Sequence, residues 1–223
     1  VYSCNKSKLG TGWGGFSTIW YGELLKNGQI LSAARLSLRV AAISPSSRQL
    51  ARQMMTQLPR NCRRVIELGG GTGVFTQALI DHGVTATDLL VLELNEELHQ
   101  HLVRQFPHSR VVCGDAGNLR EIAHEHGFHG EQGADAIISG LGLLSMPRQL
   151  QQTILQAAFD SLQPEGRFIQ FTYGPANPVI REVAEALELT SRRASFTWWN
   201  VPPATVYVYQ RRISRTMAPR SMR

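Results

Sequence analysis

Short apolar runs alternate with amphipathic segments along most of the chain. The run at 88–94 is nearly continuous, which is typical of a parallel strand buried on both faces. Asn95, Glu96 and Glu97 then open a segment of helical period with residues that favour a helix N-terminus. The alternation predicts strands at 64–68, 88–94, 110–113, 134–139 and 167–172, and helices at 74–82, 95–106, 116–126, 148–162 and 178–189.

The end of the chain has a different pattern. Segments 195–199 and 205–210 predict two further strands, which are joined through Val201, Pro202 and Pro203 and are compatible with an antiparallel sheet edge. The repeated strand–helix units before them imply a parallel sheet with helices on both faces. We therefore predict an α/β fold of the Rossmann-like type, with a seven-stranded, mostly parallel sheet and an antiparallel C-terminal strand pair.

The beginning of the chain is organised differently from this α/β region. Residues 1–20 are rich in Gly, Ser and Thr without a period, so we expect them to be poorly ordered. Residues 22–43 have helical period, with Arg35 and Arg39 on one narrow polar strip and Leu31, Ala34 and Leu38 on another, apolar face. Pro45 suits the first turn of a second helix that runs to about residue 58. The predicted divisions are 1–20, two amphipathic helices in 21–60, the α/β domain in 61–210 and a basic tail in 211–223.

The formal net charge is +6, and the charged residues are distributed unevenly along the chain. Residues 1–64 hold ten of the 23 Lys and Arg and one acidic residue, residues 65–210 hold sixteen of the 17 acidic residues, and residues 211–223 hold five Arg. Basic ends attract polyanions, either nucleic acid or an anionic membrane surface, although such ends can also serve solubility alone. The three scattered cysteines are poor material for disulfides and indicate a reducing cytoplasm.

One glycine-rich turn stands between the first predicted strand and its helix. It has the pattern E-x-G-x-G-x-G, formed by Glu67, Gly69, Gly71 and Gly73. Glycines let the backbone approach a ligand closely, and the helix start offers free N–H groups. The dinucleotide motif needs a third small residue where Val74 stands, and the lysine of a phosphate-binding P-loop is absent. The turn resembles motif I of the S-adenosylmethionine methyltransferases, which implies that Glu67 and the glycines flank the methionine part of that cofactor.

Two further carboxylates follow the next strands. Glu93 ends the second predicted strand, where a carboxylate can accept hydrogen bonds from both ribose hydroxyls. Asp115 and Ala116 follow the third strand, and the resemblance implies that they meet the adenine. The competing interpretation is a set of caps and turns in an unrelated α/β protein. Three matching positions at the ends of successive strands favour the cofactor site.

The loop after the fourth strand narrows the class of methyl acceptor. It begins Ser139, Gly140 and lacks the Asn/Asp-Pro-Pro-aromatic motif with which many base methyltransferases stack a flipped base, so it disfavours a nucleic-acid substrate. The chain resembles the bacterial phospholipid N-methyltransferases over roughly residues 30–210, with Gly142 where that family leads us to expect proline. The segments that carry the resemblance, besides motif I, are 43–51 (ISPSSRQLA), 139–147 (SGLGLLSMP), 170–175 (QFTYGP) and 199–204 (WNVPPA).

This resemblance implies successive N-methylation of phosphatidylethanolamine toward phosphatidylcholine, by a cytoplasmic enzyme associated peripherally with the inner membrane. Ser139 and Gly140 would border the transferred methyl group. Tyr173 would lie on the acceptor side and bind the lipid phosphate or orient the amine; packing of its ring is the competing interpretation. Arg181 could pair with the phosphate, or be a solvated helix residue.

Several alternatives stay open from the sequence. The helix predicted at 22–43 would dock on an anionic membrane or simply pack on the domain. An RNA adenine N-methyltransferase, or a non-catalytic domain that binds the cofactor and docks on membranes, would also explain the glycine turn and the basic ends. We predict no metal site, because the histidine pairs 99/101 and 124/126 have a spacing that faces apart on a helix. The oligomeric state is not set by these patterns.

Overall fold

The computed structural model describes residues 45–197 and 203–212. The predictions of a poorly ordered segment at 1–20 and of a helix at 22–43 lie outside the described residues, as does the tail beyond residue 212.

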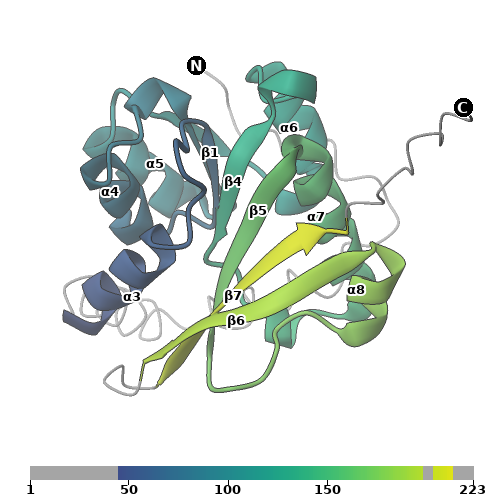
Figure 1. Cartoon of the computed structure of the whole chain (residues 1–223). Helices are drawn as coiled ribbons and strands as arrows, with labels where there is room; N and C mark the ends of the chain where they lie inside the picture. Colours follow the sequence, from purple (N-terminus) through teal and green to yellow (C-terminus); the bar gives the residue numbers. More distant parts are fainter. Residues whose placement is uncertain (1–44, 198–202, 213–223) are drawn as a thin grey trace, which may run out of the picture.

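A seven-stranded sheet forms the centre of the molecule, with strand order β3-β2-β1-β4-β5-β7-β6 (Figure 1). The first five strands are parallel, and the last two form an antiparallel pair beside β5. This confirms the predicted fold class. The strands are β1 (Val65–Leu68), β2 (Leu89–Glu93), β3 (Arg110–Cys113), β4 (Ala134–Ser139), β5 (Leu162–Tyr173), β6 (Leu189–Thr197) and β7 (Ala204–Arg211).

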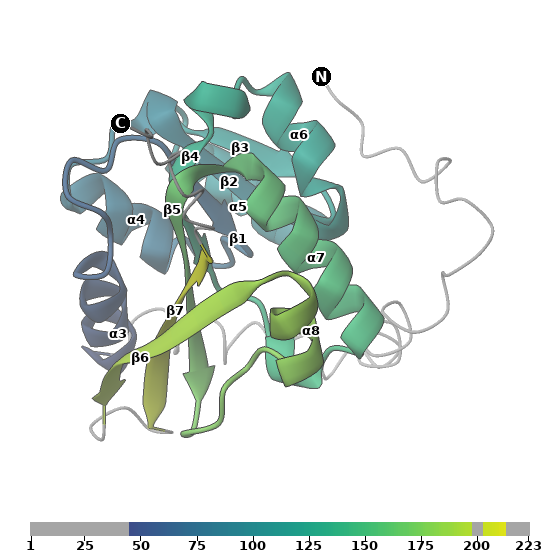
Figure 2. The ribbon, with the colours of Figure 1, turned by 45° about the vertical axis from the view of Figure 1, so that its right-hand side comes forward.

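Helices cover both faces of the sheet (Figure 2). One face packs its apolar side chains against α3 (Pro45–Met55), α4 (Val74–Asp81) and α5 (Glu96–Gln105). The other face packs against α6 (Leu119–Glu125), α7 (Arg148–Ser161) and α8 (Arg181–Ala186). Because both faces are covered, all four residues of β1 and all five of β2 are buried, which explains why these strands are apolar except for Glu67 and Glu93. Short 3-10 turns lie in the connections between these elements, at η2 (Ala86–Asp88), η3 (Ala116–Asn118), η4 (Gly130–Gln132) and η5 (Leu143–Ser145).

Two predicted boundaries were wrong. The helix predicted at 178–189 is only the short α8, because Glu188 adopts a left-handed backbone (φ 52°) and Leu189 already pairs with Arg211 of β7. Strand β6 therefore begins six residues before the predicted strand at 195–199. Likewise β5 begins at Leu162, which pairs with Ala134, five residues before the predicted start. In both places the pairing partner lies far away in the sequence, and tertiary pairing outweighs the local pattern.

The direction of α3 determines where the chain enters this fold. Near the end of α3, the backbone carbonyl of Gln57 accepts a hydrogen bond from Arg167, in the amino-terminal half of β5 (2.8 Å). Further back, Gln53 Oε1 accepts from Ser195, close to the end of β6 (3.1 Å). Since β5 and β6 point the same way, α3 runs against them. The amino-terminal end of α3 therefore lies toward the carboxyl ends of the strands (Figure 1).

Gly73 ends the glycine turn and precedes the first residue of α4. Its backbone is left-handed (φ 82°), and a Cβ at this position would lie 2.5 Å from Cε2 of Phe106 at the end of α5. A side chain there is therefore excluded twice, by backbone strain and by overlap with a buried ring. The turn is thus packed directly against the neighbouring helix.

We expect Gly73→Ala to destabilise the protein more than Gly83→Ala. Gly83 also has a positive φ (104°), but a Cβ there would meet nothing within 4 Å, so the variant should lose about 1 kcal/mol from backbone strain alone. Gly73→Ala should lose about 1–3 kcal/mol more, because the Phe106 ring must shift. Urea unfolding of both variants measures this difference, and equal losses would contradict the packing of the turn.

Candidate functional site

The first four strands of the sheet end in register. Leu68 of β1 pairs with Leu92 of β2 and with Ser139 of β4, and Glu93 of β2 pairs with Cys113 of β3. The loops that follow these strands therefore leave the sheet at one edge. Ligands of open parallel α/β sheets bind outside this carboxyl edge, where the strand order reverses. In this sheet the reversal lies between β1 and β4.

Two of these loops touch through their backbones. Gly69 donates its N–H to the carbonyl of Leu92 (2.8 Å), and Gly140 donates to the carbonyl of Leu68 (2.8 Å). A Cβ on Gly140 would lie only 3.0 Å from the carbonyl oxygen of Gly69. The structure thus brings the predicted methyl-bordering residues, buried Ser139 and Gly140, directly beside the glycine turn.

Glu93 connects the glycine turn to the end of β2. Glu93 as a residue is buried, with 8% of its surface exposed. One oxygen of its carboxylate accepts the N–H of Gly71 and the other accepts the N–H of Asn95, both at 2.8 Å. Each carboxylate oxygen can accept a second hydrogen bond. Leu94, the next residue, is 58% exposed and adds an apolar surface beside this carboxylate.

Asp115 and Ala116 lie at the same edge, after β3. The side chain of Asp115 is exposed and accepts the N–H of Gly117 (2.8 Å), so it caps the turn η3. Gly114 donates its own N–H to the carbonyl of Glu93 (3.0 Å), which fixes this loop beside the end of β2. The cap interpretation and the cofactor interpretation of Asp115 are compatible, because a carboxylate has acceptor capacity for both.

Glu67 is the buried acid of the motif. Its side chain is fully buried in β1, and the hydroxyl of Thr76 in α4 donates to its Oε2 (2.6 Å). Oε1 has no hydrogen-bond partner among the described residues. Burial raises the pKa of Glu67 to about 8; the Thr76 hydroxyl opposes this, and repulsion from Glu93 adds to it. A cation bound nearby would favour the ionised form. An unpaired buried oxygen beside an open glycine turn therefore fits a positively charged ligand.

Tyr173 projects beyond the end of β4. Ser139, the last residue of β4, pairs with Gln170 of β5, whereas β5 continues to Tyr173 and is paired over this extension with β7 on its other side. The Tyr173 side chain is 56% exposed, and its ring meets that of Phe171 edge-on, with centroids 5.5 Å apart. It stands at the expected acceptor side of the site.

Two buried glutamines that the sequence analysis did not single out hold the loop after β4. Gln170 of β5 donates from Nε2 to the carbonyl of Leu141 (2.9 Å). Gln151 of α7 donates to the carbonyl of Leu143 (2.6 Å) and accepts the N–H of Ile180 (3.0 Å). The sequence offers one sign of this role. Both glutamines stand at positions that the hydrophobic period of their helix or strand assigns to the core, where an amide needs a partner. Oε1 of Gln170 has no partner among the described residues, so it can still accept a hydrogen bond.

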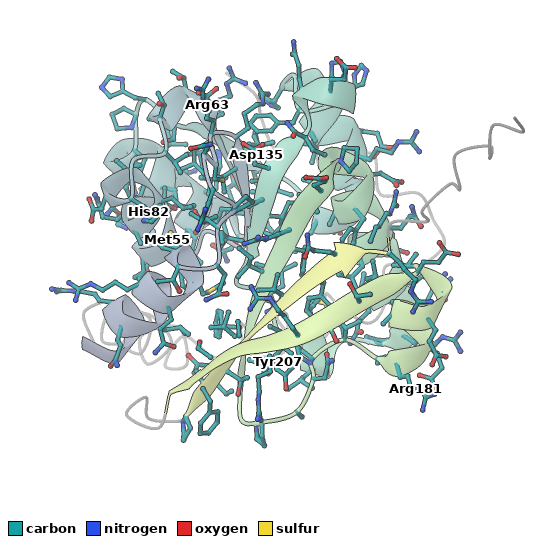
Figure 3. The ribbon with its side chains drawn as sticks, viewed as in Figure 1. Met55, Arg63, His82, Asp135, Arg181 and Tyr207 are labelled. Atoms are coloured by element: carbon teal, nitrogen blue, oxygen red, sulfur yellow. The ribbon has the colours of Figure 1, made fainter. Side chains whose placement is uncertain are left out.

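The structure does not bring Arg181 together with the other candidates. Figure 3 shows Arg181 on α8 at the periphery of the molecule, and its Nε donates to Glu185 Oε1 (2.7 Å). This ion pair raises the pKa of Arg181, and the side chain is 87% exposed. A role for Arg181 in binding phosphate stays a prediction.

The described part of the chain contains no group of three or more His, Cys, Asp and Glu side chains that could hold a metal ion. In that same part, every helix is too short or too polar to cross a membrane.

One curated relative matches much of the chain. Over 140 residues, which make up 61% of this chain and 71% of the relative, it is 34% identical to the ornithine lipid N-methyltransferase of Singulisphaera acidiphila. A separate likeness covers 47 residues, which are 51% identical to the putrescine transport permease PotI of Escherichia coli but span only 17% of that protein. No family model matches the chain.

Solved structures share the fold. A TehB-like S-adenosylmethionine-dependent methyltransferase from Corynebacterium glutamicum superposes with a TM-score of 0.58, at 19% identity, over 82% of this chain and 97% of that one. The glycopeptide N-methyltransferase MtfA, solved with S-adenosylmethionine, superposes with a TM-score of 0.56, at 12% identity, over 74% and 87% of the two chains. At these identities the likeness shows the fold.

The raised pKa of Glu67 gives stability a defined pH dependence. Between about pH 4.5 and 8 the folded chain holds a proton on Glu67 that the unfolded chain has lost, so the contribution of this group to the free energy of unfolding falls as pH rises. Glu67→Gln carries no charge at any pH. Relative to the parent protein it should gain stability through this interval, by up to about 1.4 kcal/mol for each pH unit.

Urea unfolding at pH 5, 7 and 9 measures this effect. Glu165→Gln, at an exposed position of β5, is the matched control, and its difference from the parent should stay small at all three pH values. A constant difference between Glu67→Gln and the parent across the series would show that the buried carboxyl does not titrate in this range.

Proposed function

The chain belongs to the same family as the ornithine lipid N-methyltransferase, the S-adenosylmethionine-dependent N-methyltransferases of lipids, and we propose that its acceptor is the amine of phosphatidylethanolamine, methylated in successive steps toward phosphatidylcholine. The observation that carries the proposal is the contact between Gly69 and Gly140, which joins the cofactor turn to the loop on the acceptor side. The motifs at 139–147 and 170–175, which resemble phospholipid N-methyltransferases, border this contact.

The residues of the carboxyl edge suit the cofactor. When bound, S-adenosylmethionine supplies a methyl group that is carried by a positively charged sulfur. A neutral amine can attack this methyl group and displace the sulfur from it. Glu93 offers carboxylate oxygens for a ribose diol, and Leu94 offers an exposed apolar surface at its side. The unpaired Oε1 of Glu67 lies behind the glycine turn, where ionisation of the carboxyl would favour a cation. Asp115 extends the same edge toward the adenine position.

On the acceptor side, we propose that the chain works mainly by alignment. Ser139 is fully buried and its hydroxyl accepts the N–H of Leu141 (3.3 Å), so it shapes the start of the loop rather than offering a free base. A primary ammonium is mostly protonated at neutral pH and must lose a proton before it reacts. Tyr173 is exposed, so water can reach the amine beside it and carry the proton away. Its hydroxyl would orient the head group.

We further propose that residues preceding Pro45 bring the site to an anionic membrane surface, with the protein in the cytoplasm and peripherally bound to the inner membrane. Because α3 runs against β5, its first residue, Pro45, lies toward the carboxyl ends of the strands, the same edge that carries the site. The pattern at 22–43 favours an amphipathic helix with Arg35 and Arg39 on its polar strip. Each well-placed basic residue near such a surface contributes about 1 kcal/mol.

The acceptor is tested with radiolabelled S-adenosylmethionine and vesicles that contain either phosphatidylethanolamine or ornithine lipid, with RNA as a third acceptor. We expect label in phosphatidylethanolamine. Glu93→Gln, which replaces one acceptor oxygen by a donor, should weaken cofactor binding by about 10- to 100-fold in calorimetry and lower the labelling accordingly.

Four other results would contradict the proposed acceptor, lipid methylation or the ribose assignment of Glu93. Label only in ornithine lipid would overturn the phosphatidylethanolamine proposal and assign this chain the acceptor of its relative. Label only in RNA, or in none of the three, would overturn lipid methylation at this site. Undiminished cofactor affinity in Glu93→Gln would contradict the ribose assignment.

Membrane docking is tested by deleting residues 1–43. The truncated chain should keep the circular dichroism of the α/β domain but no longer sediment with vesicles rich in anionic lipid, because the basic strip is lost. Vesicles of neutral phosphatidylcholine are the control for binding that does not depend on charge. Sedimentation of the truncated chain with anionic vesicles, at the level of the full chain, would contradict the proposal.

A further inference from the structure

Three aromatic rings form a row across the acceptor side of the site. Phe75 is the second residue of α4, and Phe171 and Tyr173 lie near the end of β5. The ring centroids of Phe75 and Phe171 are 5.6 Å apart, and those of Phe171 and Tyr173 are 5.5 Å apart. The planes of Phe171 and Tyr173 meet at 78°, so these two rings form a corner.

Strand register places this row on the same face of the sheet as Glu67, the buried acid of the glycine-turn motif. Glu67 pairs with Ile138 of β4, and Ile138 pairs with Ile169 of β5, so these side chains share a face. Side chains alternate along a strand, which puts Phe171 and Tyr173 on that face too. At its other end the row reaches the loop after β4, since a Cβ on Gly140 would lie 3.9 Å from the Phe75 ring.

The outermost ring is the accessible one. Phe75 and Phe171 are partly buried and pack against the core under α3, α4 and α5. Tyr173 is not part of that cluster and is 56% exposed. Packing therefore explains the inner two rings but not the outer one. A tyrosine held edge-on to a phenylalanine at a ligand-binding edge leaves an aromatic face free for a ligand.

Aromatic faces attract ammonium groups, and this attraction contributes most to binding when the ammonium is methylated. Each N-methyl group removes an N–H donor, so the head group loses hydrogen bonds to water and becomes easier to desolvate. Its positive charge remains, so the attraction to the ring faces persists. A corner of aromatic rings therefore binds a dimethylated or trimethylated ammonium in preference to the primary one.

We propose that Phe75, Phe171 and Tyr173 form a binding site for methylated ammonium head groups, and that this site sets how many methyl groups the enzyme adds. The inference rests on the proposed acceptor, because it concerns the later methylation steps at the same site. By retaining the monomethyl and dimethyl intermediates, the row favours their further methylation over their release.

The test compares phosphatidylethanolamine with its monomethyl and dimethyl derivatives in separate vesicles. Tyr173→Leu should lower kcat/KM for the dimethyl acceptor by about 2- to 30-fold more than for the unmethylated one, which corresponds to the cation–π range, and should accumulate early products. Tyr173→Phe keeps the ring and should keep the parent's ratio. Val103→Ala, at a 42% exposed position on α5, is the control that should leave all three activities unchanged.

Two results would overturn the inference. One is an equal loss for all three acceptors in Tyr173→Leu, which would mean that the ring serves alignment alone. The other is the same shift in ratio in Tyr173→Phe, which would assign the selectivity to the hydroxyl.

A binding measurement separates this inference from the proposed acceptor. Saturation-transfer NMR with tetramethylammonium needs no lipid; the parent and Tyr173→Phe should show transfer, and Tyr173→Leu should show much less. If no phosphatidylethanolamine is labelled but this difference is seen, the acceptor proposal fails and the aromatic site stands. If phosphatidylethanolamine is labelled and tetramethylammonium transfer is equal in all variants, the aromatic site fails and the acceptor proposal stands.

Discussion

The site depends on the close approach of two backbones, at Gly69 and Gly140. The carbonyl oxygen of Gly69 occupies the space that a side chain on Gly140 would need, and the N–H of Gly140 is bound to the end of β1. This contact holds the glycine turn and the loop after β4 beside each other. Gln170 and Gln151 then hold the carbonyls of Leu141 and Leu143 in that loop from two different elements. The relative position of the two loops is thereby set by main-chain atoms, and if the proposed reaction takes place here, the alignment it needs is built into the backbone.

Much of this arrangement could be predicted from local patterns. Strands β3 and β4 have the predicted bounds, because each is a short apolar run between polar turns. Asn95 caps α5 as its sequence suggested, by accepting the N–H of Leu98. The sequence predicts that the glycines of the turn let the backbone turn tightly, and Gly69, Gly71 and Gly73 all have a positive φ; their approach to a ligand stays a prediction. In these places local preference and tertiary structure agree, so the sequence alone was sufficient.

Other features depend on partners distant in the sequence. The early start of β6 depends on its pairing with β7, and that of β5 on its pairing with β4, neither of which a local window contains. The roles of Gln151 and Gln170 depend on which loop carbonyls come within reach after folding. The raised pKa of Glu67 follows from complete burial, which the pattern of β1 does not distinguish from partial burial. The aromatic row joins α4 to β5 across almost a hundred positions of the chain.

The course of α3 has a consequence for how such proteins diverge. Within the described residues, α3 begins at Pro45 toward the carboxyl ends of the strands, and its buried core contacts begin at Leu50. Every strand pair of the described sheet lies between Val65 and Arg211, so exchanging the sequence before Pro45 would alter none of the paired residues. Any replacement would still join the domain toward the carboxyl ends of the strands, so the sequence before Pro45 can change while the strands that carry the glycine turn stay constant.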